Sequence, residues 1–530
     1  MLTYFVILPI LIAVILYLFP SAKSSRIGAI ISQGILLIAA VYLFSISDPY
    51  NHISVAIGHY EGVLGIVLRA DTLTATFVLL TTFIFLIAAI YSFEENNSRL
   101  FWFLFFLWEG TILGIFLTGD FFNIFVLMEV STLVVSILIM FNRKNRSLYD
   151  GMIYLMINVI IIQFFLFGVG YVYSLTGTLD MLLVQERVAY LDRSFLVLPY
   201  ALLITFISLK CALIPLYNWL PKAHGTPGAP SAVSAILSGL HIKTGIYLFM
   251  RFQSIFEPVA MPEIFIVIGI ITALFGIFLA ISQNDIKLML AYSTIAQMGL
   301  IIIGLSISYT NSYNYIGSLY HIINHAVFKA ALFLGSGIIS YAYKTRDITE
   351  IRGVFKTMPV ISVAKILAIL GIIGTPLFNG SISKYFLMTG VEWWLNTIMI
   401  IINLGTIVIF MKYCTIFFGK KEDHINAKVD LLRHVPVLVL GFICFFGGIF
   451  GVWAIEFLFG LQVSVDTWGY IEKTVIFLVS FLVGYFIYKY FVIKNPIFNK
   501  IREFDPGFRE MCVSIGVFLA IILVVVGFGY

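Results

Sequence analysis

Lys210 lies inside the apolar segment 196–220, five residues before Pro215. A charge at the centre of a membrane helix costs about 2.5–3.5 kcal/mol on insertion scales, so such a residue usually faces a partner or a water-filled cavity. Pro215 removes a backbone donor and displaces the carbonyl one turn earlier, which opens the helix close to the charge. An intramembrane charge beside a broken helix is typical of an ion path.

Two carboxylates also fall at the middle of apolar segments. Glu129 lies in the segment 121–141 and Glu109 in the segment before it. A carboxylate and a lysine that are buried together each stabilise the charged form of the other, so moving one changes the proton affinity of its partner. We interpret Glu129 with Lys210 as a switch. The alternative is that each carboxylate is protonated or bonded to a neighbouring hydroxyl.

Lys243 lies mid-segment in the next apolar run, with His241 two residues earlier. Positions two apart point to different faces of a helix, so these side chains do not serve one contact in the same way. Lys243 is the stronger candidate for a proton relay. His241 equally suits a packing histidine whose ring nitrogens bond to backbone carbonyls.

His321, His325 and Lys329 are spaced by four residues in the segment 313–343. This spacing predicts one stripe along one helix face. Imidazole changes charge near neutral pH, which favours a proton wire. Hydrogen-bonded contacts between helices are one alternative. Zinc is another, although no acidic residue accompanies the histidines in this helix.

Lys384 follows Pro376 in the stretch GIIGTPLFNGSISK, which contains three glycines. A second helix is therefore predicted to break beside a second buried lysine. Two interrupted helices in corresponding halves, each with its own charged residue, are the pattern of an inverted-repeat transporter.

The composition indicates that these residues are positioned by the helices of a membrane protein. The chain is 61% hydrophobic and 11% charged, with a mean hydropathy of +1.03, far outside soluble globular values. Apolar stretches long enough to cross a bilayer recur along about 16 segments. These are 2–19, 26–46, 72–91, 99–118, 121–141, 151–175, 197–220, 228–251, 262–283, 285–308, 313–343, 359–388, 395–418, 434–459, 474–493 and 511–529. The prediction is one all-α, polytopic membrane protein.

Orientation follows from the basic residues. If the N-terminus is outside, 21 of the 32 lysines and arginines fall in inner loops and 5 in outer loops, which agrees with the positive-inside rule. The others, Lys412 among them, lie in or beside the segments. The net charge of +5 is therefore a consequence of topology, and nucleic-acid binding is not expected. The four cysteines lie in or beside apolar segments at no metal-ligand spacing, and no nucleotide, flavin or iron–sulfur motif occurs, so neither a metal nor a cofactor is expected.

Five stretches in a fixed order carry a resemblance to a known family. They are GDFFNIFVLMEVSTL (119–133), LKCALIPLYNWLPKAHGTPGAPSAVSAILSGLHIKTGIYLFMR (209–251), NDIKLMLAYSTIAQMGL (284–300), HIINHAVFKAALFLGSG (321–337) and GTPLFNGSISK (374–384). The chain resembles the antiporter-like subunits of respiratory complex I, multisubunit cation/proton (Mrp-type) antiporters and membrane-bound hydrogenases over roughly residues 70–420. The resemblance implies a core of about 14 helices with two inverted five-helix repeats.

The resemblance also implies roles for single residues. Proton translocation is expected of Glu129, Lys210, Lys243, His321, His325, Lys329 and Lys384, with Glu109, Asp120, His241 and Lys412 as weaker candidates and helix breaks at Pro215 and Pro376. The family usually has a second proline where this chain has Leu377, and a Gly-Phe pair in place of Gly380-Ser381. These departures loosen the expected geometry of the second break but keep its charge.

From these features we expect N-terminal helices (1–98), two half-channel units (99–251 and 262–418) and C-terminal helices (434–530, including about two added ones). The expected function is proton transport, with sodium as a further ion. The chain would be a multi-pass subunit of a complex in a prokaryotic plasma membrane, and this complex would be a membrane-bound hydrogenase or an NADH/quinone-type oxidoreductase. Its partners would be other membrane subunits and the lipid bilayer. The alternatives are a D-type component of a multisubunit sodium/proton antiporter without a redox module, and a structural scaffold. A long lateral helix is not expected after the core, which argues against the most distal complex I component.

Overall fold

In a computed structural model of this protein, the apolar segments form helices, many of which begin at a polar capping residue. The structure describes residues 1–47, 52–60, 65–95, 98–226, 228–308, 311–420, 431–493 and 495–528. Three of the 21 basic residues assigned to inner loops, Lys421, Lys428 and Lys494, lie outside the described residues. Aspartates begin many of the helices: the side chains of Asp71, Asp120 and Asp285 each accept a hydrogen bond from a backbone N–H of the first turn, which the helix itself leaves unsatisfied.

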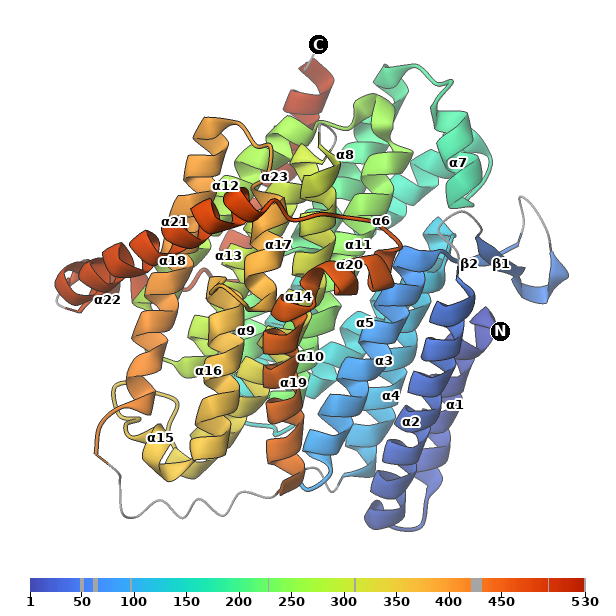
Figure 1. Cartoon of the computed structure of the whole chain (residues 1–530). Coiled ribbons are helices and arrows are strands. Elements are labelled where there is room, and N and C mark those ends of the chain that lie inside the picture. The colour runs from blue at the N-terminus through green and yellow to red at the C-terminus, as the bar shows by residue number, and fades with distance from the viewer. Residues whose placement is uncertain are drawn as a thin grey trace. The chain divides into compact units, whose positions relative to one another are not determined.

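The chain divides into two compact units. Unit 1 comprises residues 1–229, 240–261 and 506–530. Its helices are α1 (Leu2–Leu18), α2 (Ala22–Ile46), α3 (Thr72–Ser92), α4 (Arg99–Leu117), α5 (Phe121–Ile139), α6 (Asn145–Thr176), α7 (Met181–Val188), α8 (Arg193–Lys210), α9 (Trp219–Gly225), α11 (Ile242–Ile255) and α23 (Phe508–Phe528) (Figure 1). A short hairpin of β1 (Ile53–Ala56) and β2 (Val67–Ala70) pairs antiparallel, with Ile53 opposite Ala70. The C-terminal helix α23 packs on α8 and α6.

Unit 2 comprises residues 230–239 and 262–505. Its helices are α10 (Ser231–Ile236), α12 (Pro262–Ser282), α13 (Ile286–Ile307), α14 (Ser312–Tyr343), α15 (Val354–Thr357), α16 (Pro359–Ile373), α17 (Asn379–Leu387), α18 (Trp393–Cys414), α19 (Leu431–Ile449), α20 (Gly451–Phe459), α21 (Thr467–Ile487) and α22 (Ile497–Arg502). Helix α14 is the centre of this unit, because α10, α13, α16, α17 and α19 all pack against it.

The predicted all-α membrane fold is confirmed. The described residues contain 14 helices long and apolar enough to cross a membrane, and two shorter apolar helices, α1 and α16, occupy the remaining predicted segments. The predicted segment 434–459 is divided at Phe450 into α19 and α20. Both predicted C-terminal helices are present as α21 and α23.

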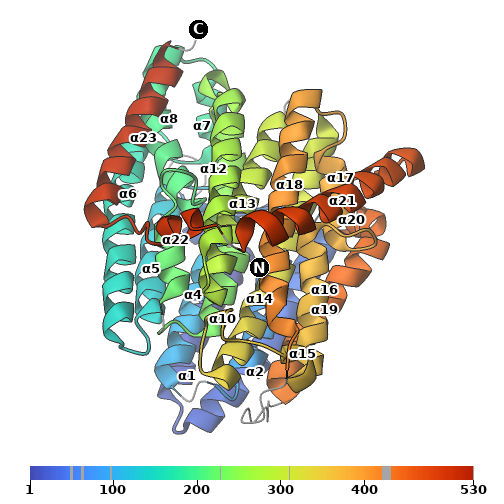
Figure 2. The ribbon, with the colours of Figure 1, turned by 90° about the vertical axis from the view of Figure 1, so that its left-hand side faces the viewer.

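The expectation that no lateral helix follows the core was wrong. Within unit 2, α21 packs on α18 and runs obliquely across it, and α22 continues to α12 (Figures 1 and 2). The length and hydropathy of α21 nevertheless match those of a membrane-spanning helix. Composition alone therefore did not distinguish a helix that lies across its neighbours from one that runs alongside them. The argument against a distal complex I component is removed.

Candidate functional site

Lys210 is the last residue of α8, and its side chain is 2% exposed. The helix ends there, and residues 211–218 form the predicted break around Pro215. The indole N–H of Trp219 donates to the carbonyl of Leu209 at 2.7 Å, which satisfies one backbone acceptor at the open helix end. The break is therefore held by a side chain from the next helix, and the lysine lies at its edge.

The Lys210 ammonium is held by neutral groups of two other helices. Its Nζ donates to Oδ1 of Asn158 on α6 at 2.6 Å and to Oγ1 of Thr132 on α5 at 3.2 Å. Hydrogen bonds to a charged group are worth about 1.5–3 kcal/mol each, so Asn158 is a principal stabiliser of this charge. Sequence reasoning missed both residues, because nothing local in the chain relates them to Lys210.

Glu129 lies one turn before Thr132 on α5 and is half-buried. Its charge interacts with that of Lys210 through space, yet the two form no direct ion pair within the described residues. The expected pair is thus brought to the same place but not into contact. Because Lys210 already has neutral partners and does not contact Glu129, the two side chains could move together or apart.

The other predicted residues of unit 1 lie on α4, at the start of α5, on α11 and, for His241, at the end of the π-helix Leu237–His241 that leads into α11. Lys243 is fully buried in α11. His241 is surrounded by polar partners, since Trp108 Nε1 and Ser131 Oγ lie 3.4 and 3.5 Å from its Nδ1 and Tyr154 Oη lies 3.3 Å from its Nε2. These partners are side chains, not the backbone carbonyls that the packing alternative supposed.

The two weaker acidic candidates have separate structural partners. Glu109 on α4 is fully buried and accepts a hydrogen bond from the Gln33 side chain. Asp120 lies at the start of α5, where its Oδ1 accepts from the Asn123 N–H at 2.7 Å. Burial raises the pKa of Asp120 above its ordinary value, against the lowering effect of that hydrogen bond. The structure therefore shows Asp120 as a helix cap.

The second break separates α16 from α17 in unit 2. Gly374 ends α16 with φ +80°, and Leu377 also has a positive φ of 71°. A proline at position 377 could not adopt this conformation, which explains the departure from the family pattern. A Cβ on Gly380 would lie 1.9 Å from the carbonyl oxygen of Gly371, so only glycine fits where α17 approaches α16.

Lys384 on α17 reaches back to the broken end of α16. Its Nζ donates to the carbonyl of Ile372 at 2.7 Å and to Oδ1 of Asn403 on α18 at 2.6 Å. A cation at a helix C-terminus is stabilised by the helix dipole and by the unsatisfied carbonyls there. The lysine thus caps the broken helix with the same charge that sequence analysis predicted to carry protons.

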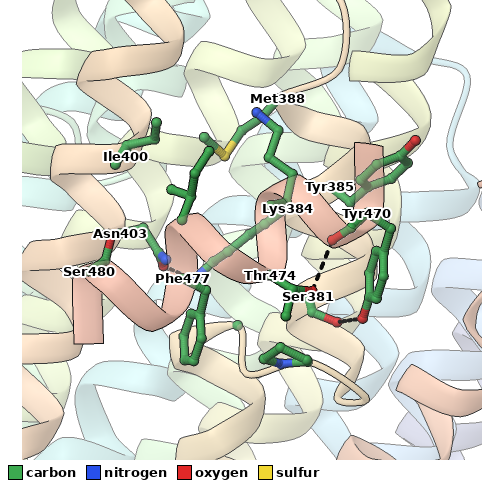
Figure 3. A pocket seen from close by; sticks show the side chains of 14 residues that line it. Ser381, Lys384, Tyr385, Met388, Ile400, Asn403, Tyr470, Thr474, Phe477 and Ser480 are labelled. Carbon is green, nitrogen blue, oxygen red and sulfur yellow. Dashed lines mark hydrogen bonds between the residues drawn. The ribbon is translucent and has the colours of Figure 1, made fainter. Parts of the chain in front are cut away.

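A cavity of about 50 Å³ adjoins Lys384, and Figure 3 shows the Lys384 and Asn403 side chains at its wall. This volume has room for about three water molecules. Helix α21 closes one side: Tyr470 Oη lies 2.9 Å from Ser381 Oγ, and it accepts from the Leu377 N–H at 3.4 Å. The oblique helix therefore contacts the second break directly.

The predicted stripe on α14 is present and buried. His321 bonds through Nδ1 to Ser383 Oγ at 2.9 Å and through Nε2 to Gln297 Oε1 at 3.0 Å. Gln297 in turn donates to Thr406 Oγ1 on α18 at 3.1 Å. Because Ser383 directly precedes Lys384 on α17, a chain of hydrogen bonds connects the histidine to the neighbourhood of the second lysine.

The same stripe continues to His325 and Lys329. His325 packs edge-on against Phe328, with ring centroids 5.4 Å apart. Lys329 is fully buried and donates to the carbonyl of Leu290 at 2.9 Å and to the Ser293 hydroxyl. Within the described part of the chain, no group of three or more His, Cys, Asp or Glu side chains gathers as a metal site would require.

Comparisons with known proteins decide the family. Residues 118–411, which include both breaks, match the family described as NADH:quinone oxidoreductase/Mrp antiporter, TM. The chain belongs to this family. Its resemblance to antiporter-like subunits is thereby confirmed, and it is a multi-pass membrane protein.

Two relatives illustrate the breadth of the antiporter-like family. The D subunit of the Na(+)/H(+) antiporter of Alkalihalophilus pseudofirmus is 33% identical over 82% of this chain and 92% of its own length. The N subunit of the NADH-quinone oxidoreductase of Desulforudis audaxviator is 32% identical over 70% of this chain and 76% of its own length.

Solved structures show the same fold. A chain of the Mrp complex from Dietzia sp. superposes with a TM-score of 0.80 at 22% identity, covering 90% of this chain and 99% of that one. A chain of the membrane-bound sulfane sulfur reductase (MBS), an archaeal respiratory membrane complex, superposes with a TM-score of 0.78 at 22% identity over 91% and 99%.

Two further lysines of this antiporter-like chain have well-defined surroundings. Lys412 at the end of α18 donates to the carbonyls of Ile281 and Gln283 at 2.7 and 2.6 Å, so it caps the C-terminus of α12. Lys365 on α16 was not among the predicted site residues, yet it is fully buried and bonds to Ser336 Oγ at 2.8 Å and to the Tyr413 hydroxyl. The signal that could have identified Lys365 was its position inside an apolar segment.

Proposed function

We propose that this chain is a proton-translocating, antiporter-like subunit of a multisubunit ion-pumping complex in a prokaryotic plasma membrane. The observation that carries the proposal is the recurrence of one arrangement in both units. In each, a transmembrane helix is interrupted, and a buried lysine at the interruption is held by an asparagine of a neighbouring helix, Lys210 by Asn158 and Lys384 by Asn403.

The proposed chemistry is reversible protonation of these lysines. Neutral hydrogen-bond acceptors stabilise an ammonium less than a carboxylate does, so the proton is not trapped. In unit 1, approach of Glu129 favours the charged lysine and withdrawal of Glu129 favours release of the proton. In unit 2, the bonded series of Ser383, His321 and Gln297 offers exchangeable groups beside Lys384.

Partner subunits are part of this proposal, because the relatives are named as subunits of multisubunit assemblies. A second candidate function is a D-type component of a sodium/proton antiporter. It is supported by the antiporter relative, because this chain matches 92% of that relative's length. Purifying the assembly and identifying its components by mass spectrometry distinguishes the two. A hydrogenase-type or quinone-type module supports the redox-linked complex, and its absence supports the antiporter.

Lys384→Met tests the proton role in unit 2. Methionine keeps much of the packing volume but cannot carry a proton, so proton uptake into inverted vesicles should fall to the level of vesicles without the complex. Lys344→Met is the matched control, because Lys344 is exposed at the end of α14. Wild-type uptake by an assembled Lys384→Met complex would contradict the proposed role.

A further inference from the structure

A cavity of about 420 Å³ in unit 2 shares no lining residue with either break and has no part in proton transfer as proposed above. Its wall combines the turn between α12 and α13, the segment 348–352, the end of α18, the π-helix Tyr488–Val492 and helix α22. Three basic side chains from three of these segments line it: Arg352, Lys412 and Arg502. No carboxylate does, among the described residues.

The three cations are half-buried and are held by neutral groups. Arg502 Nε donates to the carbonyl of Ser282 at 2.8 Å, and its Nη2 to Oδ1 of Asn284 at 3.3 Å. Lys412 donates to the same Asn284 oxygen at 3.1 Å. Arg352 donates to the carbonyl of Ile351 at 2.8 Å. Lys412 and Arg502 thus share one amide oxygen, and none of the three cations forms an ion pair with a carboxylate of the described residues.

Two carboxylates that adjoin the lining segments in sequence, Asp285 and Asp347, have their own hydrogen-bond partners. Asp285 forms an ion pair with Arg346 at 2.7 Å, and it also caps α13. Asp347 accepts hydrogen bonds from the backbone and the hydroxyl of Thr349 at 2.7 and 2.6 Å. Gathering like charges on a partly buried wall costs free energy unless a counter-charge is supplied. The charge of Asp347 acts on Lys412 through space, but no carboxylate of the described residues lines the cavity beside its three cations.

We propose that this cavity binds a negatively charged phosphate group. Arginine presents a planar fork of donors that matches phosphate oxygens, and Asn495 and Asn499 add amide donors to the same wall. The positive-inside rule puts this wall at the inner face, where anionic lipids are concentrated and where basic pockets between helices bind their headgroups. Ile493, which is 57% exposed, and Phe498 also line the cavity and offer apolar contact to an acyl chain.

The phosphate could come from an anionic phospholipid or from a soluble phosphate compound, and the experiment separates these sources. The purified assembly is titrated with short-chain phosphatidylglycerol, short-chain phosphatidylcholine and inorganic phosphate, and binding is followed by native mass spectrometry and thermal shift. We expect phosphatidylglycerol to bind at least about tenfold more tightly than phosphatidylcholine, because only the former lacks a compensating ammonium. Inorganic phosphate that binds as tightly as phosphatidylglycerol would assign the site to a soluble compound. Equal weak binding of all three overturns the proposal without any variant.

Variants place the binding in this cavity. Arg352→Gln combined with Arg502→Gln removes two of the three cations and should weaken phosphatidylglycerol binding by about a hundredfold or more, since each of the two charged hydrogen bonds contributes about tenfold or more. Lys500→Gln is the matched control, because Lys500 lies on α22 with Arg502 but is exposed and does not line the cavity. Unchanged binding in the double variant, or an equal loss in the Lys500 control, would show that the phosphate is bound elsewhere or by general surface charge.

Discussion

Asn158 is expected to tune the proton affinity of Lys210. Its Oδ1 accepts a hydrogen bond of 2.6 Å from the lysine Nζ, so Asn158→Leu removes about 1.5–3 kcal/mol of stabilisation from the charged form. Because about 1.4 kcal/mol corresponds to one pH unit, the part of the pH profile that reports protonation of Lys210 should move about 1–2 units toward lower pH. Asn158→Asp introduces a negative charge at the same place and should move it toward higher pH.

The assay is proton uptake into inverted vesicles, measured across pH for assemblies of equal protein content. Asn145→Leu is the matched control, because Asn145 is an exposed residue of the same helix, about 20 Å along α6 from Asn158. Opposite shifts for the leucine and aspartate variants distinguish electrostatic tuning from simple misfolding, which would lower activity in both without moving the profile. Identical pH profiles in the wild type and both variants would refute the reasoning.

Two other perturbations have defined outcomes. Glu129→Gln removes the charge that interacts with Lys210 through space, so the pH optimum of proton uptake should move downward, and an unchanged profile would count against the switch. Asp71→Asn should lower the free energy of unfolding at pH 7 by about 1.5–3 kcal/mol, because Asp71 forms an ion pair with Arg251 at 2.6 Å. Burial acts to raise the pKa of Asp71, but Arg251 and the Thr74 N–H hold it below its ordinary value of 3.8, so this stability is present above that pH and is lost as pH falls further. Thermal unfolding of wild type and variant should therefore converge below about pH 4; a constant difference down to pH 2 would contradict it.

The main elements of both breaks could be predicted from sequence, because their signals are local. Lys210 and Pro215 are five residues apart, Pro376 and Lys384 are eight apart, and the α14 stripe follows from a spacing of four. The side chains that hold these groups could not be predicted. Thr132, Asn158 and Asn403 belong to helices far away in the sequence, and a polar residue in an apolar run does not reveal which partner it faces.

The sequence also did not predict the geometry between the helices. Glu129 and Lys210 were interpreted as a switch, but the sequence did not indicate that the lysine bonds to neutral groups in this structure, because the distance between two helix faces is set by packing that no local pattern encodes. Likewise α21 has the length and hydropathy of a spanning helix, and only its contacts with α18 and with the break at Leu377 reveal its oblique course.

The most direct test of the account is proton flux through the assembled complex that carries Lys210→Ala, compared in inverted vesicles with the wild type. If a buried ammonium at the first break transfers protons, flux is abolished while the variant protein still assembles with its partners in wild-type amounts. Wild-type flux from a fully assembled Lys210→Ala complex would contradict the account.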